Sequence, residues 1–362
     1  MKANGEYDLE IGVKMERKIK VLHVLKSSIY SGAENVVLTI IKHLRNDYEL
    51  AYVATDGEIR SVLEEEEINF FLLDKFSGES IRKVIKKFEP DIVHAHDFTA
   101  TVICTSIHGR FRIISHLHYD PPWSRKWNFK TLIYILSASR ISKILSVSKK
   151  SYQNMIFADM MEEKCEVIGN PIDIDRISKM GDLEEQVETI DLLFVGRFVE
   201  QKNPQRFIQI VKVLAQKGVN LKCAMLGDGE LWEDCRRLIA EYELQEQIQL
   251  LGFKKNPYIY MKAAKILCVT SRWEGFGLVV IEANIMGTVV LCSYTSGVVE
   301  ILGDTARELC STNEEFVSKI SAILSDEKVY MEWRDVATRR ILGIPRIDEY
   351  MRTIDKIYQE LL

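Results

Sequence analysis

Residues 271–299 read SRWEGFGLVVIEANIMGTVVLCSYTSGVV and carry the most informative pattern in the chain. Two glutamates, Glu274 and Glu282, stand eight positions apart and enclose the turn Gly275-Phe276-Gly277. The apolar residues 278–287 that follow predict a buried helix ending at a glycine. A helix that opens at a glycine turn leaves its first backbone N–H groups unpaired, at the positive end of the helix dipole. The stretch therefore predicts an anion site that suits a diphosphate.

The two carboxylates indicate the shape of the ligand. Glu274 stands at the mouth of the turn, and Glu282 is expected about 12 Å further along at ~1.5 Å rise per residue. A carboxylate at each end of a phosphate site suits an extended ligand with hydroxyls at both ends, such as a nucleotide-sugar. A buried strand-to-helix turn with two solvated glutamates is the alternative, and the spacing alone favours that alternative.

On both sides of this stretch, short β-branched runs alternate with longer helical patterns. Strands are expected at 20–25, 50–55, 70–73, 92–96, 113–118 and 143–148, and then at 189–195, 222–226, 248–251, 265–270 and 289–292. Strands that alternate with helices predict parallel sheets covered on both faces. Two consecutive sets predict an α/β fold of two Rossmann-like domains that face a central cleft, with ligands at the carboxyl ends of the strands.

A chain of 362 residues has room for these two domains. We expect a tail at residues 1–16, an N-terminal domain at 17–165, a C-terminal domain at 166–345 and a final amphipathic helix at 346–362. The chain has no apolar run of the ~18 residues that a membrane span needs, and residues 1–16 lack the apolar core of a secretory signal.

Composition narrows the class of protein and its location. Hydrophobic residues make up 47% of the chain and charged residues 28%, as in globular proteins. The seven cysteines form no CxxC pair, which disfavours a zinc ribbon and suits buried thiols in a reducing cytoplasm. Net charge is +4 over residues 17–165 and −7 over 166–362. The basic half suits an anionic membrane or acceptor, or is ordinary scatter, and no nucleic-acid partner is expected.

Residues 274–289 resemble the EGFGLPxxEAxxxGxPV signature of the family-4 retaining glycosyltransferases, which have the two-domain GT-B fold. The chain has Glu274-Gly-Phe-Gly-Leu-Val-Val-Ile-Glu282-Ala, followed by Gly287-Thr-Val. The resemblance implies that Glu274 holds the sugar hydroxyls and Glu282 the ribose. It also implies that the final helix packs back on the N-terminal domain, that the N-terminal domain receives the acceptor, and that the C-terminal domain binds the donor.

The segment Gly196-Arg197-Phe-Val-Glu-Gln-Lys202 resembles the GRxxxxKG segment of the same family, whose Arg and Lys hold the leaving diphosphate. Cleavage of the sugar–phosphate bond leaves negative charge on the diphosphate, and two fixed cations stabilise that charge without a metal. This chain has Asn203 where the family has glycine. Two exposed basic residues in a loop are the alternative.

Shorter segments resemble other loops of the family. Gly32 belongs to a GGAE-like loop in which Ser31 replaces the first glycine, and Ser296 replaces the first glycine of a GGxxE-like turn. Glu300 in that turn is either a functional carboxylate or an ordinary acid near a helix start. The donor site is expected to include Glu282, Gly275, Phe276, Gly277, Leu278, Gly196, Gly32, Gly227 of a GxG turn, and Phe253 near the nucleotide base.

Two histidine pairs end strands, at His94 and His96 and at His116 and His118. Alternation places both members of a pair on one face of the sheet, so a metal site is one interpretation. The resemblance favours a site without metal, in which His118 orients donor hydroxyls and His96 packs. It also implies acceptor contacts from Asp97 and Asp120, whereas His23 is expected in the core.

Residues 123–134 (WSRKWNFKTLIY) mix aromatic and basic side chains. Such a mixture suits an interfacial membrane contact or a lipid-linked acceptor. A surface helix whose aromatic rings face the core is the alternative.

These features together predict a metal-independent retaining glycosyltransferase with Glu274, Arg197, Lys202 and His118 in its catalytic site. The expected donor is a nucleoside-diphosphate-sugar, UDP or GDP, with no separate cofactor. The expected acceptor is a sugar or lipid-linked sugar in cell-surface polysaccharide or glycolipid assembly, in the cytoplasm or in peripheral contact with the inner membrane face. A nucleotide-sugar epimerase and a catalytically silent nucleotide-sugar-binding subunit remain as alternatives. A Rossmann dehydrogenase is disfavoured, because no glycine-rich turn with a later acid follows the first strand.

Overall fold

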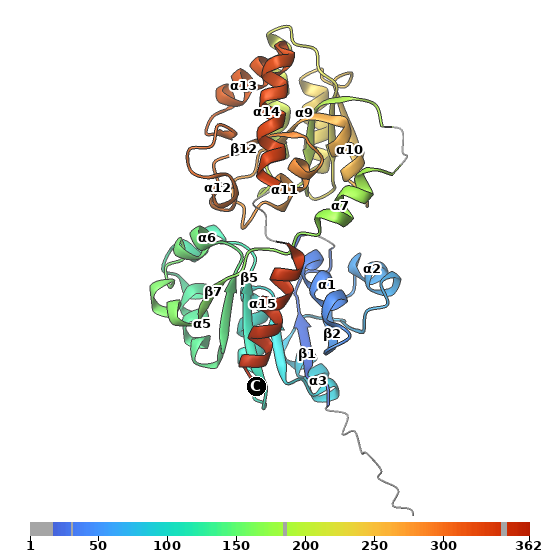
Figure 1. Cartoon of the computed structure of the whole chain (residues 1–362). Helices are drawn as coiled ribbons and strands as arrows, with labels where there is room; N and C mark the ends of the chain where they lie inside the picture. The colour runs from blue at the N-terminus through green and yellow to red at the C-terminus, as the bar shows by residue number, and fades with distance from the viewer. Residues whose placement is uncertain (1–16, 30–31, 184–186, 342–345) are drawn as a thin grey trace, which may run out of the picture.

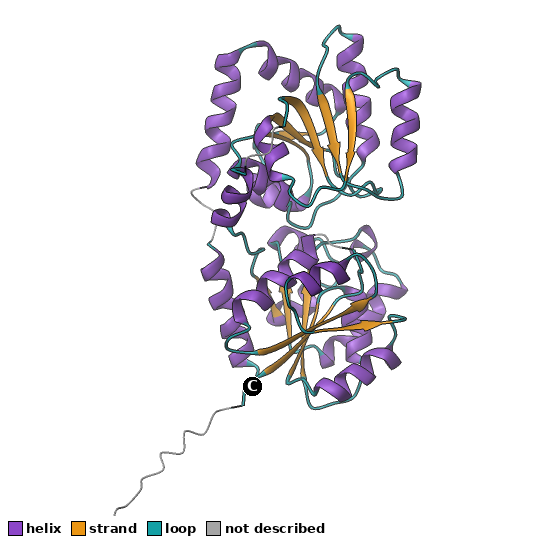
Figure 2. Ribbon diagram, turned by 90° about the vertical axis from the view of Figure 1, so that its right-hand side faces the viewer, coloured by secondary structure: helices purple, strands orange, loops and turns teal. Residues whose placement is uncertain are grey.

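The computed structural model describes residues 17–29, 32–183, 187–341 and 346–362, which form two α/β domains, one above the other in Figure 1. In each domain a sheet lies between layers of helices (Figure 2). The expected tail at 1–16 and Ser31 lie outside the described residues. Within the described parts, no helix is long and apolar enough to cross a bilayer.

The N-terminal domain is built on a parallel sheet of seven strands in the order β3-β2-β1-β4-β5-β6-β7. The strands are β1 (Lys20–Val24), β2 (Glu49–Thr55), β3 (Phe70–Leu73), β4 (Ile92–Ala95), β5 (Arg112–Leu117), β6 (Lys143–Ser146) and β7 (Cys165–Val167). The helices are α1 (Gly32–Leu44), α2 (Ile59–Glu65), α3 (Gly78–Phe88), α4 (Phe98–Thr105), α5 (Phe129–Ser137) and α6 (Lys149–Gln153), with 3-10 turns η1 (Pro122–Arg125), η2 (Ala138–Arg140) and η3 (Asp159–Lys164).

The C-terminal domain repeats this plan with six parallel strands in the order β10-β9-β8-β11-β12-β13. The strands are β8 (Ile190–Val195), β9 (Cys223–Leu226), β10 (Ile248–Gly252), β11 (Ala264–Val269), β12 (Val289–Ser293) and β13 (Leu309–Cys310). The helices are α7 (Ile174–Gly181), α8 (Pro204–Gln216), α9 (Trp232–Glu241), α10 (Tyr258–Ala263), α11 (Leu278–Ile285), α12 (Ser296–Leu302), α13 (Asn313–Ser325) and α14 (Glu327–Arg340).

The predicted fold of two Rossmann-like domains is confirmed. Every strand expected from the sequence is present within a residue or two of its expected ends, and only the short edge strands β7 and β13 were not expected. In both sheets the strand order reverses beside the first strand, between β1 and β4 and between β8 and β11. Ligands of such sheets bind in the crevice outside these reversal points, at the carboxyl ends of the strands.

The final helix, α15 (Ile347–Glu360), lies on the N-terminal domain although it follows the C-terminal domain in sequence (Figure 1). Its apolar face buries Tyr350, Met351, Ile354, Ile357 and Tyr358. These side chains join the core that β1, β2 and α1 form on one face of the N-terminal sheet. Because the apolar positions recur every three or four residues, one face of the helix is buried along its whole length.

Candidate active site

The site lies where the two strand-order reversals face each other across the domain boundary. In the C-terminal domain, the loop after β8 carries Gly196, Arg197 and Lys202, and the loop after β11 carries Glu274 and the glycine turn. Since β8 and β11 are neighbours in the sheet, loops separated by more than seventy residues meet at one point. The expected donor-site segments are therefore adjacent in space.

Lys202 and Glu274 are in direct contact. The Lys202 Nζ lies 2.6 Å from the Glu274 Oε1, which also accepts a 2.6 Å hydrogen bond from the Ser271 hydroxyl. Glu274 is only 4% exposed. A buried carboxylate needs an opposite charge close by, and Lys202 supplies that charge. The structure thus fixes the orientation of both side chains before any ligand arrives.

Arg197 extends toward the N-terminal domain. Burial raises the pKa of Tyr119 in that domain, and the positive charge of Arg197 opposes the increase. The Arg197 guanidinium lies 3.5 Å from the Gln201 side-chain oxygen and has no carboxylate within ion-pair distance among the described residues. It is therefore a cation at the domain boundary that a ligand could use.

The second glutamate of the pair lies on α11. Gly277 adopts φ +93° and ends the glycine turn, so the helix begins at Leu278 as expected. The Tyr258 hydroxyl donates a 3.4 Å hydrogen bond to the Glu282 Oε1. Burial raises the Glu282 pKa to about 7, while this hydrogen bond and the charges of Lys202 and Arg176 oppose the increase. Lys202 is thus near enough to act electrostatically on both glutamates.

A narrow crevice runs between the domains along α11. Its lining includes Leu278 and Glu282 from α11 and Asn35 and Thr39 from α1. On the same side, Gly32 at the start of α1 lies opposite Leu278, with the leucine Cδ1 3.8 Å from the position that a Cβ would take. Gly32 and α11, both expected at the donor site from the sequence, therefore face each other.

Two glycines allow the backbones of the two domains to meet. A Cβ at Gly275 would lie 1.8 Å from the carbonyl oxygen of His118, and a Cβ at Gly297 would lie 2.5 Å from the carbonyl carbon of Gly275. Real Cβ atoms do not approach other atoms this closely, so only glycine fits at either position. His118 and the glycine turn are consequently neighbours across the boundary.

The departure from the family pattern at Ser296 has a structural role in this chain. Its hydroxyl donates a 3.2 Å hydrogen bond to the Asp120 Oδ1 of the other domain. Asp120 is fully buried and also accepts from Arg125 at 2.7 Å and from Asn154 at 3.0 Å. The serine therefore adds a contact between the domains that glycine could not make.

Glu300 also bridges the domains. Its Oε2 accepts hydrogen bonds from the Ser148 hydroxyl (3.2 Å) and the Lys150 backbone N–H (3.1 Å). It thus contacts the start of α6 in the other domain. This contact between the domains was not expected from the sequence, and a role of Glu300 as a functional carboxylate stays a prediction.

Three further positions fit their expected places in the loops. Asn203 adopts the left-handed conformation, with φ +50°, at the start of α8, which explains why it can stand in place of a glycine. Gly227 has φ +130°, and a Cβ there would lie 1.9 Å from the Gly196 carbonyl oxygen. Phe253 follows β10 and its ring is exposed.

The histidines of the N-terminal sheet form a connected cluster that the sequence pattern only hinted at. His118 Nε2 lies 3.1 Å from His96 Nδ1, and His96 Nε2 lies 2.9 Å from His23 Nδ1. A second chain links His116 to His94 at 3.2 Å and His94 to the Tyr358 hydroxyl of α15 at 2.8 Å. His23 is fully buried, as expected of a core residue, and it belongs to the first chain.

Burial governs the charge of this cluster. It lowers the pKa of His118 and of His23 to about 3, so both rings are neutral at physiological pH. The imidazole nitrogens of two triples, His23–His94–His96 and His96–His116–His118, lie within 4.8 Å of one another, close enough to consider a metal ion. Most of these nitrogens already pair with each other, which favours a hydrogen-bonded network.

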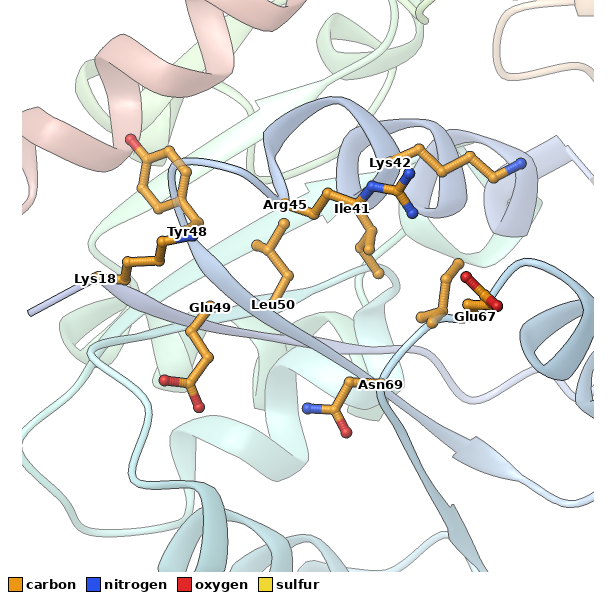
Figure 3. Close-up of a pocket in the computed structure, with 10 residues that line it drawn as sticks. Lys18, Ile41, Lys42, Arg45, Tyr48, Glu49, Leu50, Glu67 and Asn69 are labelled. Atoms are coloured by element: carbon orange, nitrogen blue, oxygen red, sulfur yellow. The ribbon is translucent and has the colours of Figure 1, made fainter.

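A broad hollow of about 470 Å³ lies elsewhere, at the amino ends of β1, β2 and β3. Figure 3 shows Lys42 of α1 and Arg45, which directly follows α1, at its edge, with Glu49 and Leu50 on β2. Catalytic loops of parallel sheets follow the opposite ends of the strands. We therefore assign the site to the domain boundary and not to this hollow.

Comparison with known proteins agrees with this geometry. Residues 175–340 match the family described as Glycosyl transferases group 1, and residues 30–176 match Glycosyltransferase Family 4. The two matches meet at residues 175–176 and together span most of the chain.

The chain is similar to curated proteins along most of its length. It is 25% identical to the N-acetylgalactosamine-N,N'-diacetylbacillosaminyl-diphospho-undecaprenol 4-alpha-N-acetylgalactosaminyltransferase of Campylobacter jejuni, over 87% of this chain and 93% of that protein. It is also 25% identical to the UDP-Gal:alpha-D-GlcNAc-diphosphoundecaprenol alpha-1,3-galactosyltransferase of Escherichia coli, over 77% and 80%. The crystal structure of Anabaena HepE with UDP-glucose shares the fold, with TM-score 0.79, 20% identity, and coverage of 94% and 100%.

Proposed function

This chain belongs to the GT-B glycosyltransferases of group 1 and family 4, and from that premise we propose the reaction that it performs. It moves a sugar from a nucleoside-diphosphate-sugar to a hydroxyl of an acceptor, with retention of anomeric configuration and without a metal. The setting is cell-surface polysaccharide or glycolipid assembly, in the cytoplasm and at the inner membrane face.

The observation that carries the proposal is the cluster of Arg197, Lys202 and Glu274 beside the first turn of α11. A diphosphate at this turn meets unpaired backbone N–H groups, one free guanidinium and one ammonium. When the bond between the anomeric carbon and the diphosphate oxygen breaks, its electron pair stays on that oxygen. The two cations and the helix dipole then stabilise the added charge.

The carboxylates near the sugar end support a mechanism without a covalent enzyme intermediate. Asp97 accepts hydrogen bonds from the backbone N–H groups of Ala100 (2.6 Å) and Lys26 (3.2 Å). Asp120 pairs with Arg125, and Glu274 with Lys202. The proposal therefore contains no enzyme nucleophile, and the acceptor oxygen attacks the anomeric carbon on the face that the diphosphate leaves. The acceptor proton passes to the departing diphosphate oxygen.

The ligand classes follow from chemistry and from the relatives. Glu282 accepts hydrogen bonds from ribose hydroxyls, Glu274 from sugar hydroxyls, and neutral His118 orients the sugar. UDP is the favoured nucleotide, because the Escherichia coli relative is named for UDP-Gal and HepE was crystallised with UDP-glucose. A diphospho-lipid-linked sugar is the favoured acceptor, because both curated relatives are named for one. Transfer is favoured over epimerisation, since the named relatives are transferases.

The test is thermal stabilisation by a panel of UDP-, GDP- and ADP-sugars in EDTA, on wild type, Glu282→Ala and Glu241→Ala. Glu241 is an exposed glutamate on α9 of the same domain and is the matched control. A donor at 100 times its dissociation constant adds about 2.7 kcal/mol of stability. We expect one nucleotide class to stabilise wild type and Glu241→Ala, and to stabilise Glu282→Ala much less. Absence of any shift with wild type would contradict the donor site.

A further inference from the structure

The outer surface of α5 has an unusual distribution of side chains. The helix begins with a capping box, in which the Asn128 side chain accepts from the backbone N–H of Thr131 while the Thr131 hydroxyl accepts from that of Asn128. The face turned toward the domain buries Thr131, Tyr134 and Ser137, all of which carry hydroxyls. The Tyr134 hydroxyl lies 2.8 Å from the Ser115 hydroxyl on β5. The hydroxyl-bearing positions of this helix thus point inward.

Several of its large apolar side chains point outward. Phe129 is 77% exposed, Leu132 48% and Leu136 78%, and Trp127 just before the helix is 59% exposed. Phe129, Leu132 and Leu136 are spaced three and four residues apart, so they form one stripe. Single exposed apolar residues are ordinary, whereas a continuous group of large ones marks a contact surface. We call Trp127, Phe129, Leu132 and Leu136 with Lys126 and Lys130 the α5 surface.

The charges around this surface have one sign. Residues 121–158 contain seven Lys and Arg and no Asp or Glu. Arg125, Lys143 and Lys150 pair with acids from other segments. Within the described parts of the chain, Lys126 and Lys130 have no carboxylate at ion-pair distance, and the Lys130 ammonium lies 5.5 Å from the centre of the Trp123 ring. Unpaired cations thus border the exposed apolar stripe.

We propose that the α5 surface docks on a lipid bilayer that contains anionic headgroups. Apolar side chains that enter the interface beside lysines that meet headgroup phosphates are the pattern of a peripheral amphipathic helix. A protein partner would need matching acids, whereas an anionic bilayer supplies both the apolar layer and the negative charge. Figure 1 shows α5 at the outer side of the N-terminal domain, away from α1 and α15, where a flat surface could approach.

The surface is also joined to the cleft. Arg125, two residues before Trp127, holds Asp120, and Asp120 contacts Ser296 of the other domain. Docking at α5 would therefore anchor a segment that these two contacts link to the boundary between the domains. This arrangement serves an acceptor carried on a lipid, and in that respect the inference rests on the proposed function.

The experiment is co-sedimentation of the full chain with vesicles of phosphatidylglycerol and phosphatidylcholine, and with phosphatidylcholine alone. The variants are the double change Phe129→Ser and Leu136→Ser, the double change Lys126→Glu and Lys130→Glu, and the control Met331→Ser. Met331 is an exposed apolar residue on α14 of the other domain. Because all the changed side chains are exposed, we expect every variant to fold.

We expect wild type and the control to bind the anionic vesicles, less so at high salt, and to bind phosphatidylcholine alone weakly. Each double variant should lower the partition coefficient at least about tenfold, a factor equal to about 1.4 kcal/mol. Failure of wild type to sediment, or sedimentation of both double variants like wild type, would overturn the proposal. If wild type binds no vesicles and a double variant changes the oligomeric state, the α5 surface would contact a second copy of the protein. That result would also overturn the proposal. Thermal stabilisation of the same variants by the nucleotide-sugar donor is measured without vesicles. A failure of the proposed donor site would therefore be detected separately from a failure of membrane docking.

Discussion

At the scale of single residues, the burial of Glu282 predicts how the stability of the protein depends on pH. Its pKa in the folded protein is raised by burial to about 7 from an ordinary 4.5. The folded state therefore holds the proton more tightly than the unfolded state, and this contribution to stability is full below the unfolded value and is lost as pH rises toward 7. Glu282→Gln should be more stable than wild type at pH 8, by about 1–3 kcal/mol, with the difference shrinking toward pH 5.

Denaturant titrations of the protein without ligand at pH 5, 6.5 and 8 measure this difference, with Glu241→Gln as the exposed control. If the free energy of unfolding differs between Glu282→Gln and wild type by the same amount at all three pH values, burial does not raise the pKa of this carboxyl group. A carboxylate that costs stability above neutral pH needs another reason to be present. Binding of ribose hydroxyls gives such a reason, so donor affinity should change in the direction opposite to stability.

The glutamates, Arg197 and Lys202 could be chosen as candidates from the sequence because their spacing within loops is local. The structure brings Lys202 and Glu274 into contact, and the roles of all four residues stay predictions. The glycine turn was also predicted, but the sequence indicated only one of the two reasons why glycines are needed there. Gly277 is needed for its positive φ, which local sequence suggests, whereas Gly275 is needed because the His118 carbonyl lies where a Cβ would be. A contact between positions 118 and 275 depends on how the domains meet, and no local pattern contains that information.

At the scale of elements, the second prediction concerns the contribution of α15 to the stability of the N-terminal domain. Ile354 lies on α15 and is fully buried in the core of the N-terminal domain, although α15 follows the C-terminal domain in sequence. Ile354→Ala should lower the free energy of unfolding by about 2–4 kcal/mol, the sum of lost apolar burial and the cavity left behind. Chemical denaturation measures it.

Arg352→Ala is the matched control, since Arg352 lies on the exposed side of the same helix. We expect less than about 0.5 kcal/mol from that change. Equal, small effects from both variants would show that α15 detaches from the N-terminal domain in solution.

Elements with a strong internal pattern were predictable, and short or inverted ones were not. The edge strands β7 and β13 have three and two residues, too few for a period to be seen. Residues 123–134 showed a mixture of aromatic and basic side chains, but the sequence could not say which of these side chains face the sheet. Of the aromatic rings of residues 123–134, Tyr134 is buried and Trp127 and Phe129 are exposed, so neither expectation for that segment held for all of its rings.

At the scale of the whole molecule, the two domains were predictable and the contacts that join them were not. Ser151 donates to the Gly275 carbonyl at 3.0 Å, and Ser296 donates to Asp120. These residues lie 124 and 176 positions apart in sequence. No local pattern shows which of these residues pair with each other, so the two contacts emerge only when the two sheets face each other.

The last prediction concerns how the whole site supplies positive charge. Arg197 and Lys202 from one loop and the start of α11 from another meet at the point where we propose that the diphosphate departs. Because these groups are fixed by the fold, we expect sugar transfer to be unchanged by EDTA and by 1,10-phenanthroline. Lys202→Met, which keeps much of the side chain and removes its charge, should lower the turnover rate by about 10²–10³-fold. Release of nucleoside diphosphate in the presence of acceptor measures both effects.

The two chelators separate two places where a metal could act. Inhibition by EDTA that Mg²⁺ reverses would mean that a hard cation bridges the phosphates and that Arg197 and Lys202 are insufficient. Inhibition by phenanthroline that Zn²⁺ reverses, and that His116→Gln reproduces, would place a metal among the histidines instead, at His96, His116 and His118. If neither chelator acts, the neutral histidines serve as a hydrogen-bonded support that holds His118 beside Gly275. His116→Gln should then retain sugar transfer and lose mainly stability, since a buried ring nitrogen of His94 would have a poorer partner.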